Sequence, residues 1–458
     1  MSRSSPPPHI LAVPYPAQGH VIPLMELSLC LANHGFRVTF VNTEFNHKRV
    51  VNALAEKKFI GDQIHLVWIP DGLQPWEDRN ELGKLSEAIL EVMPGKLEEL
   101  INKLQDDKIT CVIADESMGW ALEVADRLKI RRVAFWPAAA AMLALKLCVP
   151  KLIDDGIIEN DGTIIKKQMI QLSPTMPSMN TVNFPWACFD ELTTQKTLFY
   201  YMQRNNRTTK LANWVICNSA IELEPPAFTT LAPEIIPIGP LLASSRLGST
   251  AGYFWPQDST CLKWLDQQLP QSVIYVAFGS FTVLEQTQFQ ELALGLELSN
   301  RPFLWVVRPD AVNDQANDSY PQEGYLDRIG TRGQLVGWAP QQKVLSHPSI
   351  ACFLSHCGWN STLEGLSNGV PFLSWPYFAD QFFNESYVCD VWKEGLKFNR
   401  NESGIITQVE IKDKVEQVLG DYRFKARALQ MKEMVMRSVT EGGNSHMNFN
   451  NFIKWMKA

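Results

Sequence analysis

The chain has 458 residues, a formal net charge of −7 at pH 7 and 45% hydrophobic residues. This length exceeds what a single hydrophobic core usually holds, so it predicts two domains of about 200 residues each. The acidic balance argues against a protein that binds nucleic acid, because such a protein needs a basic face to displace counterions from the phosphates.

The nine cysteines form an odd set without the spacing of a disulfide framework, which favours free thiols in a reducing compartment. The first apolar run is short and is interrupted by Pro14 and Pro16, so we interpret it as a strand and not as a signal peptide. No apolar run approaches the length of a membrane span. These features predict a cytoplasmic protein without a membrane span.

The first half of the chain alternates short apolar runs with amphipathic segments, a pattern typical of parallel α/β layers. Residues 9–16 predict a strand, and residues 21–35 predict a helix that begins near Pro23 and is capped by Gly35. Further short β-rich runs lie at residues 36–42, 64–70, 110–116 and 131–137.

The second half repeats this scheme. A helix is predicted at residues 285–300, and strands are predicted at residues 272–280, 302–308, 334–340, 350–356 and 371–376. The run between the two halves is rich in Gly, Ser and Pro and has no clean period, which indicates a linker. The expected division is a first domain at 1–240, a linker at 241–258, a second domain at 259–440 and a helix at 441–458 that returns to the first domain.

The segment HCGWNSTLEGLSNGVP, residues 356–371, follows a predicted strand and opens a predicted helix. The free N–H groups of such a first turn, together with the helix dipole, bind an anion without a cationic side chain. Taken alone, Asn360 and Ser361 are better explained as helix caps. The carboxyl ends of strands in open α/β sheets are nevertheless where ligands bind, so this segment is a candidate phosphate site.

Residues 338–381 closely resemble the 44-residue signature of plant UDP-sugar-dependent glycosyltransferases of secondary metabolism. Residues 9–44, 111–125 and 258–280 are similar to other parts of the same family, so nearly the whole chain is covered. The resemblance implies the GT-B arrangement, in which two Rossmann-like domains face each other across a cleft. The first domain would bind the acceptor and the second the UDP-sugar.

The resemblance also implies roles for residues of the signature. Trp338 would stack on the uracil with Gln341 at its edge, and Glu364 would accept hydrogen bonds from the ribose hydroxyls. Because Gln381 ends the signature as it does in glucose-using relatives, UDP-glucose is the expected donor. The residues that would address the sugar are Trp359, Asp380 and Gln381.

The diphosphate would be held by His356, Asn360 and Ser361, with Gly358 in the same turn and Ser280 from an earlier strand end. Donors fixed on the leaving group stabilise the charge that develops there, so we expect no metal. The Asp-x-Asp that holds a metal in the other common nucleotide-sugar fold does not occur in the chain.

Four histidine and cysteine positions raise a zinc site as a rival interpretation. Cys352, His356 and Cys357 lie close in sequence, with His347 upstream. However, the chain has no paired Cys-x-x-Cys, so we disfavour zinc. The expected reaction therefore needs the UDP-sugar as co-substrate and no further cofactor.

His20 follows the first strand and precedes a helix N-terminus, which favours a neutral imidazole. Asp115 ends another strand of the same predicted sheet. A surface histidine and a helix cap are the simpler interpretations of these two residues. The resemblance implies that His20 is the general base, that Asp115 holds its other ring nitrogen, and that single displacement inverts the anomeric centre.

The acceptor site is expected in the first domain, where the candidate residues are mostly apolar. They favour a flat or greasy phenolic, flavonoid or terpenoid molecule with a nucleophilic hydroxyl, although each of them could equally belong to the core. Pro137 stands where many relatives have Ser or Thr, which leaves the donor sugar less secure. The candidates are Trp76, Met118, Trp120, Phe184, Trp186 and Phe189.

Other enzyme classes fit less well. A dehydrogenase would show G-x-G-x-x-G after the first strand, and a serine hydrolase would show G-x-S-x-G. The chain has neither motif at those places. We therefore predict a monomeric glycosyltransferase, with a catalytically silent UDP-sugar-binding protein as the alternative.

Overall fold

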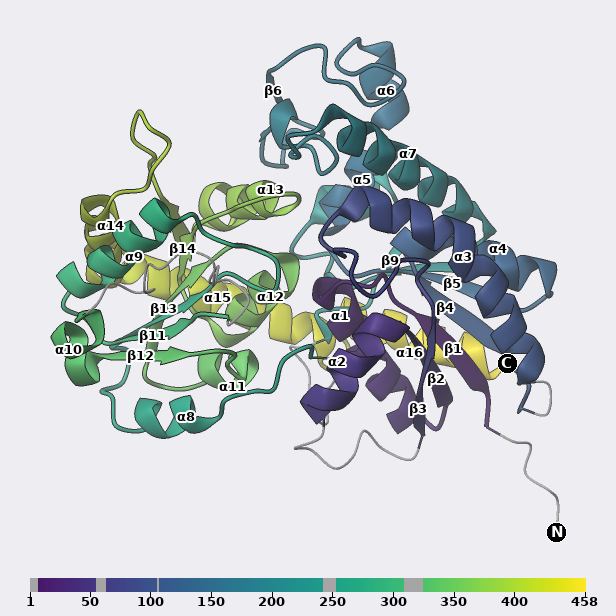
Figure 1. The fold of residues 1–458 in the computed structure, drawn as a ribbon, viewed down its shortest axis with the longest axis horizontal. Helices are drawn as coiled ribbons and strands as arrows, with labels where there is room; N and C mark the ends of the chain where they lie inside the picture. Colours follow the sequence, from purple (N-terminus) through teal and green to yellow (C-terminus); the bar gives the residue numbers. More distant parts are fainter. Residues whose placement is uncertain (1–6, 55–62, 105–106, 242–252, 309–323) are drawn as a thin grey trace. The chain divides into compact units, whose positions relative to one another are not determined.

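The computed structural model describes residues 7–54, 63–104, 107–241, 253–308 and 324–458 (Figure 1). The chain forms two compact units. Unit 1 comprises Met1–Trp255 together with Val435–Ala458, and unit 2 comprises Pro256–Met434. Each unit is an α/β structure built around its own parallel sheet, which confirms the predicted fold class.

The sheet of unit 1 has seven strands in the order β3-β2-β1-β4-β5-β8-β9, and all neighbouring pairs are parallel. Parallel strands need crossover connections, which here contain most of the helices. The order reverses between β1 and β4, as in other doubly wound sheets. The strands are β1 His9–Val13, β2 Arg37–Thr43, β3 Ile64–Ile69, β4 Cys111–Asp115, β5 Arg131–Trp136, β8 Trp214–Cys217 and β9 Ile235–Pro237.

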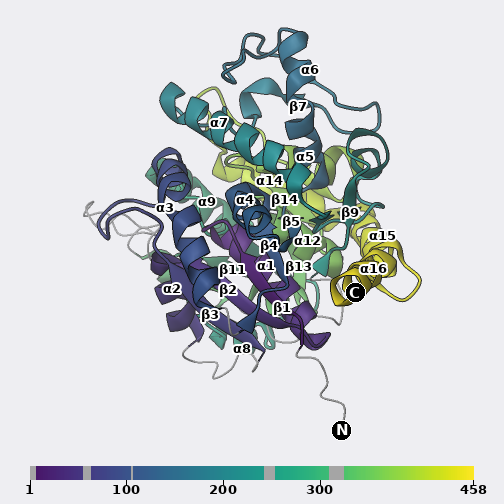
Figure 2. The ribbon, with the colours of Figure 1, turned by 90° about the vertical axis from the view of Figure 1, so that its right-hand side faces the viewer.

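Alternate residues of β1 enter two different cores, one on each face of this sheet. Figure 2 shows the strands and helices of the unit from another side. Ile10 packs with α1 and α16 on one face, while Leu11 packs with α3 and α4 on the other. The helices of unit 1 are α1 Gln18–Asn33, α2 Glu44–Leu54, α3 Leu82–Lys103, α4 Gly119–Arg127, α5 Ala140–Leu147, α6 Val149–Asp154, α7 Leu192–Thr208 and α16 Asn444–Lys457. A short hairpin of β6 Met169–Ile170 and β7 Met179–Asn180 completes this unit.

Helix α1 begins at Gln18 and therefore starts earlier than the sequence predicts. Ala17 has extended backbone angles and its carbonyl accepts from the N–H of His20 at 2.9 Å and of Val21 at 2.9 Å. His20 consequently lies in the first turn of the helix and not in a loop before it. The predicted end is confirmed, because Gly35 has a φ of +84°, which favours glycine.

Unit 2 contains a parallel sheet of six strands in the order β12-β11-β10-β13-β14-β15. Its strands are β10 Val273–Ala277, β11 Phe303–Val306, β12 Gly333–Val336, β13 Ile350–Ser355, β14 Phe372–Ser374 and β15 Gly395–Lys397. Its helices are α8 Thr260–Leu265, α9 Gln286–Leu298, α10 Tyr325–Ile329, α11 Gln341–Leu345, α12 Trp359–Asn368, α13 Gln381–Ser386, α14 Gln408–Gly420 and most of α15 Tyr422–Val439.

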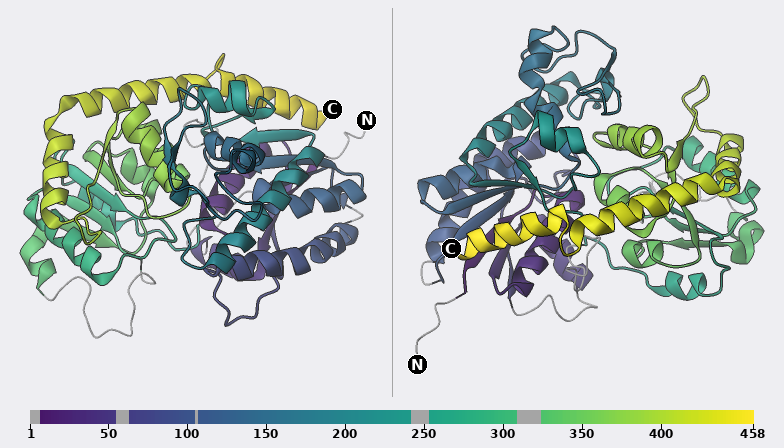
Figure 3. Two further views of the ribbon diagram at one scale, coloured as in Figure 1. Left: turned by 90° about the horizontal axis from the view of Figure 1, so that it is seen from above. Right: turned by 180° about the vertical axis from the view of Figure 1, so that it is seen from behind.

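The division between the units can be compared with the expected domains. Of the predicted linker 241–258, residues 242–252 lie outside the described residues, and the units meet in sequence between Trp255 and Pro256. The last turn of α15 belongs to unit 1, because Ser438 donates to Ser445 at the start of α16 at 3.0 Å. Helix α16 is the yellow helix that ends at the C-terminus (Figure 3). Its Phe452 is buried in a core of unit 1.

None of the helices in the described ranges is both long and apolar enough to cross a membrane.

Candidate active site

His20 and Asp115 meet at the carboxyl edge of the unit 1 sheet. Strands β1 and β4 are neighbours in register, with Val13 opposite Ala114, so the residues after them emerge side by side. Nδ1 of His20 lies 2.7 Å from Oδ2 of Asp115. The Asp115 side chain is completely buried, whereas 27% of the His20 side chain is exposed.

The Asp115 carboxylate is held from both sides. Its Oδ1 accepts from the backbone N–H of Ser117 at 2.8 Å while its Oδ2 faces His20. The ring of Tyr15 lies 5.1 Å from the His20 ring, and burial raises the pKa of Tyr15 to about 12, so this phenol is neutral at physiological pH. The pair can therefore hold the imidazole in one orientation and stabilise it when it takes up a proton.

The segment after β13 forms a tight turn at the carboxyl edge of the unit 2 sheet. Cys357 has a φ of 62°, unusual for a residue other than glycine. This backbone is stabilised because Cys357 N donates to Ser355 Oγ at 3.1 Å and Asn384 Nδ2 donates to the Cys357 carbonyl at 2.9 Å. Helix α12 then begins at Trp359 with Gly358 as its N-cap, and its first turn contains Asn360 and Ser361, as predicted.

His356 lies between two glycines. A Cβ atom on either Gly279 or Gly358 would collide with its ring, so both positions must lack a side chain. Nδ1 of His356 is buried, and burial together with the nearby Arg308 guanidinium lowers the pKa of His356 to about 4. His356 is therefore a neutral imidazole at physiological pH, suited to hydrogen bonding and not to carrying a charge.

Gln341 connects three polar side chains of unit 2. Its Oε1 accepts from Tyr275 at 3.0 Å, and its Nε2 donates to Ser361 Oγ at 2.9 Å and to the Glu364 carboxyl group. Burial raises the pKa of Glu364 to about 7, against the effect of hydrogen bonds from Gln341 and Gln342. Trp338 precedes this group, and its carbonyl accepts from Asp258 N at 2.7 Å.

Gln381 and Asp380 lie at the start of α13. Oε1 of Gln381 accepts from the backbone N–H groups of Tyr377 at 2.8 Å and Phe378 at 3.1 Å. These two bonds fix the orientation of the Gln381 amide. Asp380 accepts from Asn384 Nδ2 at 2.8 Å.

Two further donor-site candidates lie close to aromatic rings. Ser280 is partly buried and precedes Phe281, whose ring lies 4.7 Å from that of Phe378. This contact joins the segments after β10 and β14. The Trp359 ring is almost completely buried and lies 6.3 Å from that of Trp392.

The candidate acceptor residues lie in three different surroundings. Met118 and Trp120 are completely buried in the core shared by α3 and α4. Phe184 and Trp186 are also buried, with their rings 4.7 Å apart, while Phe189 is partly buried. Trp76, in contrast, is 81% exposed.

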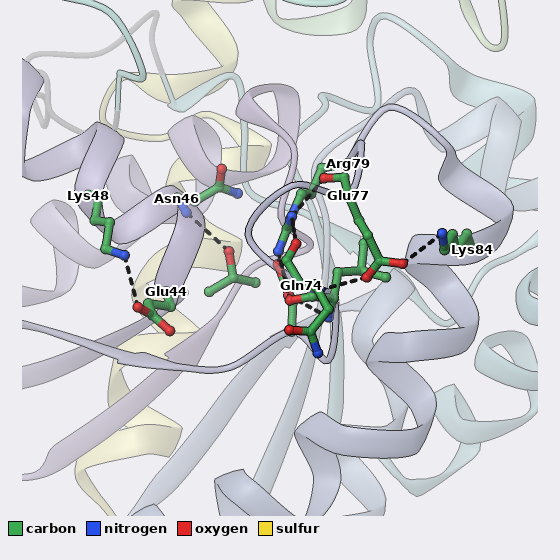
Figure 4. A network of polar contacts seen from close by, with 10 residues as sticks. Glu44, Asn46, Lys48, Gln74, Glu77, Arg79 and Lys84 are labelled. Atoms are coloured by element: carbon green, nitrogen blue, oxygen red, sulfur yellow. Dashed lines mark hydrogen bonds and ion pairs between the residues drawn. The ribbon is translucent and has the colours of Figure 1, made fainter.

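Trp76 belongs to a loop that follows β3 and is organised by Arg79 (Figure 4). The Arg79 guanidinium donates to both carboxylate oxygens of Asp71, at 3.3 and 3.2 Å, and to the carbonyls of Leu73, Gln74 and Glu77. Glu77 in turn pairs with Lys84 at 2.7 Å. The loop is therefore a fixed support for an exposed tryptophan.

Residues 85–436 match the family described as UDP-glucoronosyl and UDP-glucosyl transferase. The chain belongs to this family of UDP-glycosyltransferases. It is 49% identical to UDP-glycosyltransferase 83A1 of Arabidopsis thaliana over 98% of this chain and 97% of that protein. It is 36% identical to linamarin synthase 1 of Manihot esculenta, over 98% of this chain and 96% of the relative.

Solved structures of plant relatives have the same fold. A UDP-glucosyltransferase from Polygonum tinctorium that glucosylates indoxyl matches with a TM-score of 0.82 and 28% identity, over 100% of both chains. Phytolacca americana UGT2, in complex with UDP-2-fluoro-glucose and pterostilbene, matches with a TM-score of 0.80 and 28% identity, over 99% of this chain and 100% of that one. This glycosyltransferase is thus a GT-B enzyme of plant secondary metabolism that uses a UDP-sugar and acts on small molecules. The alternative of a catalytically silent binding protein has no support among these relatives.

The structure of this UDP-glycosyltransferase adds charged residues that sequence patterns did not single out. Arg308, after β11, is only 5% exposed and donates from Nη1 to the Gly279 carbonyl at 2.8 Å. Buried Glu116, next to Asp115, pairs with Lys146 of α5, whose ammonium lies 4.6 Å from the centre of the Trp136 ring. The Arg308–Gly279 and Lys146–Glu116 contacts each join residues about 30 positions apart. No sequence motif predicts either contact.

The described residues offer no support for a zinc site. Over the described ranges, no group of three or more His, Cys, Asp and Glu side chains is placed to hold a metal ion. His347 instead contacts Ser349 at 2.8 Å and Asp266 at 3.2 Å.

Proposed function

We propose that this UDP-glycosyltransferase transfers glucose from UDP-glucose to a hydroxyl group of a small, largely apolar acceptor, with inversion and without a metal. His20 is the general base and Asp115 orients it. The observation that carries this proposal is the 2.7 Å contact between His20 Nδ1 and the buried Asp115 carboxylate. Because Nδ1 faces Asp115, Nε2 is the nitrogen that accepts the proton.

The reaction is a single displacement. The acceptor oxygen forms a bond to the anomeric carbon while its proton passes to Nε2 of His20, and the bond from that carbon to the β-phosphate oxygen breaks. The electron pair of the broken bond stays on the diphosphate, and UDP leaves. Asp115 stabilises the imidazolium that results. Attack opposite the leaving group inverts the anomeric centre.

Unit 2 supplies the donor site in this proposal. Trp338 stacks on the uracil beside Gln341, and Glu364 accepts from the ribose hydroxyls. The first-turn N–H groups of α12 bind the diphosphate and stabilise its developing charge. Side chains of the same site that contact the diphosphate are Ser280, His356, Asn360 and Ser361.

Glucose is the proposed sugar because Gln381 ends the signature as it does in glucose-using relatives. The Gln381 amide is oriented so that its Nε2 donates to a sugar hydroxyl, and the Asp380 carboxylate accepts from another. Buried Trp359 would support this end of the site through its contact with Trp392. UDP-glucose should therefore be used faster than UDP-galactose.

The proposed acceptors are phenolic, flavonoid or terpenoid molecules. The solved relatives support a flat aromatic class, since one is in complex with pterostilbene and another glucosylates indoxyl. Exposed Trp76, on its rigid loop, is the candidate most accessible to such a ligand. We further propose a monomeric, cytoplasmic enzyme, and the nine free cysteines support a reducing compartment.

One experiment tests the core of the proposal. The purified enzyme is assayed with UDP-glucose and UDP-galactose against a panel of phenols and terpenoid alcohols, with and without EDTA, and the product is analysed by proton NMR. The expected result is a β-glucoside, formed faster from UDP-glucose and at the same rate in EDTA. An α-glucoside would rule out single displacement, and loss of activity in EDTA that a divalent ion restores would rule out the metal-free site.

A further inference from the structure

The first turn of α1 is tied to the segment with which the chain leaves unit 1. The backbone N–H of Phe254 donates to Oε1 of Gln18 at 2.9 Å, and both residues are buried. Gln18 is the first residue of α1 and stands two positions before His20. The contact spans 236 positions in sequence, yet it ends on the turn that carries the proposed base.

Arg49 of α2 holds the same segment from another side. Its guanidinium carbon lies 4.6 Å from the centre of the Phe254 ring and 4.4 Å from that of Trp255. A guanidinium group at this distance from an aromatic ring is attracted to it and packs well against its flat surface. Arg49 therefore packs against both aromatic rings of the segment.

Helix α2 also contacts the turn that carries His20 directly. Asn46, three positions before Arg49, donates from Nδ2 to the carbonyl of Pro16 at 2.8 Å. Its own backbone N–H donates to Thr43 Oγ1 at 3.2 Å, which fixes the start of α2 (Figure 4). Residues three apart share one face of a helix, so one face of α2 supports both the turn and the segment.

The segment of Phe254 and Trp255 lies at the boundary between the two units in the sequence. Trp255 is the last residue of unit 1 before the chain continues into unit 2 at Pro256. The polar contacts of Gln18 and Asn46 and the contacts of Arg49 with both aromatic rings join this segment to the start of α1.

We propose that Gln18 and Arg49 are positioning residues for the transfer reaction, because they seat Phe254 and Trp255 against the turn of His20 and thereby fix the base relative to Asp115. This inference rests on the proposed role of His20 as the base.

The test replaces each positioning residue with one of similar size that lacks its polar group. Gln18→Leu and Arg49→Met should each lower kcat with an aliphatic alcohol acceptor by about tenfold, because a small displacement of a base is costly. The acceptor KM and the affinity for UDP should stay unchanged. With an acidic phenol, which ionises with less help, the loss should be clearly smaller.

Matched variants separate positioning from general damage. Gln18→Glu keeps an oxygen that can accept from Phe254 but buries a carboxyl group, so its kcat should lie between those of the wild type and of Gln18→Leu. Lys48→Met, on the same helix, removes only an exposed ion pair with Glu44 and should have no effect. If Gln18→Leu does not fold, Arg49→Met gives the same comparison between acceptors.

The outcomes distinguish this inference from the proposed function. If His20→Ala retains wild-type activity, the base itself is wrong. If His20→Ala is inactive but folded Gln18→Leu and Arg49→Met equal the wild type, only the positioning role is wrong. Equal losses with both acceptors would also overturn it, since they would indicate general damage and not a misplaced base.

Discussion

The two histidines that follow central strands of the two sheets show how surroundings decide what an imidazole can do. His20 lies in the first turn of a helix after β1 and faces a buried carboxylate at 2.7 Å. His356 directly follows β13, with Arg308 nearby and a glycine on each side. A neighbouring anion stabilises the protonated form, whereas burial and a neighbouring cation oppose it. The same side chain is therefore suited to proton transfer in unit 1 and to neutral hydrogen bonding in unit 2.

The largest effect on kinetics is expected when each of the two histidines is replaced by alanine separately. His20→Ala should lower kcat with a hydroxyl acceptor by about a hundredfold or more, the usual effect of losing a placed general base, with UDP affinity unchanged. His356→Ala should instead weaken UDP binding. Steady-state kinetics and calorimetric titration with UDP measure both. If His20→Ala glucosylates an aliphatic alcohol at the wild-type rate, His20 is not the base and the proposed difference between the two histidines is wrong.

The carboxylate of the His20 pair should matter less than the base itself. Asp115→Asn keeps the size of the side chain but loses its charge, so kcat should fall by roughly tenfold through weaker stabilisation of the imidazolium. Because the two residues act as a unit, the double variant should be little slower than His20→Ala alone. Fully multiplicative losses in the kinetics would show that the two residues act independently.

The glycines around His356 allow its surroundings to be tested without changing it. Gly279→Ala introduces a Cβ that collides with the ring and places alanine at a φ of +69°, so UDP affinity should fall by about fivefold, which corresponds to roughly 1 kcal/mol. Gly404→Ala is the matched control, because Gly404 also has a positive φ, +77°, but open space around it. Equal UDP affinities for the two variants would mean that contact with the His356 ring is unimportant.

The smallest expected effect is on the free energy of unfolding. It concerns Glu364, a buried residue of unit 2. Its pKa is raised from 4.5 to about 7, so the folded state holds this proton more tightly than the unfolded chain. The stability that this group contributes is therefore complete below about pH 4.5 and decreases as the pH rises to 7.

Urea unfolding of the wild type and of Glu364→Gln between pH 4.5 and 8 measures this contribution. The difference in the free energy of unfolding between the two proteins should decrease up to pH 7 and then stay constant. His356, whose pKa is lowered, has the opposite pH dependence, but both proteins contain it and it cancels. A difference that is independent of pH would show that Glu364 titrates normally.

Much of the fold could be predicted from local patterns. Apolar runs such as residues 9–16 and 350–356 lie in buried central strands, because parallel strands covered on both faces need continuous apolar sequence. The short strands β6, β7, β8, β9 and β15 were not predicted. Length alone does not explain this, since β14 also has three residues and was predicted. The predicted start of α1 was also too late. The prediction placed it near Pro23, whereas the helix begins at Gln18, directly after the N-cap Ala17.

The sequence by itself determined the two α/β units, the residue types after each strand and, through the signature, the family. Only the tertiary structure decided the electrostatic state of those residues. The neutral state of His356 depends on its burial and on Arg308, which follows β11. The contact at the start of α1 depends on Phe254, and the pairing of Glu116 depends on Lys146. Strand and helix periods are local, whereas burial and charge pairing depend on residues that folding brings together from distant positions.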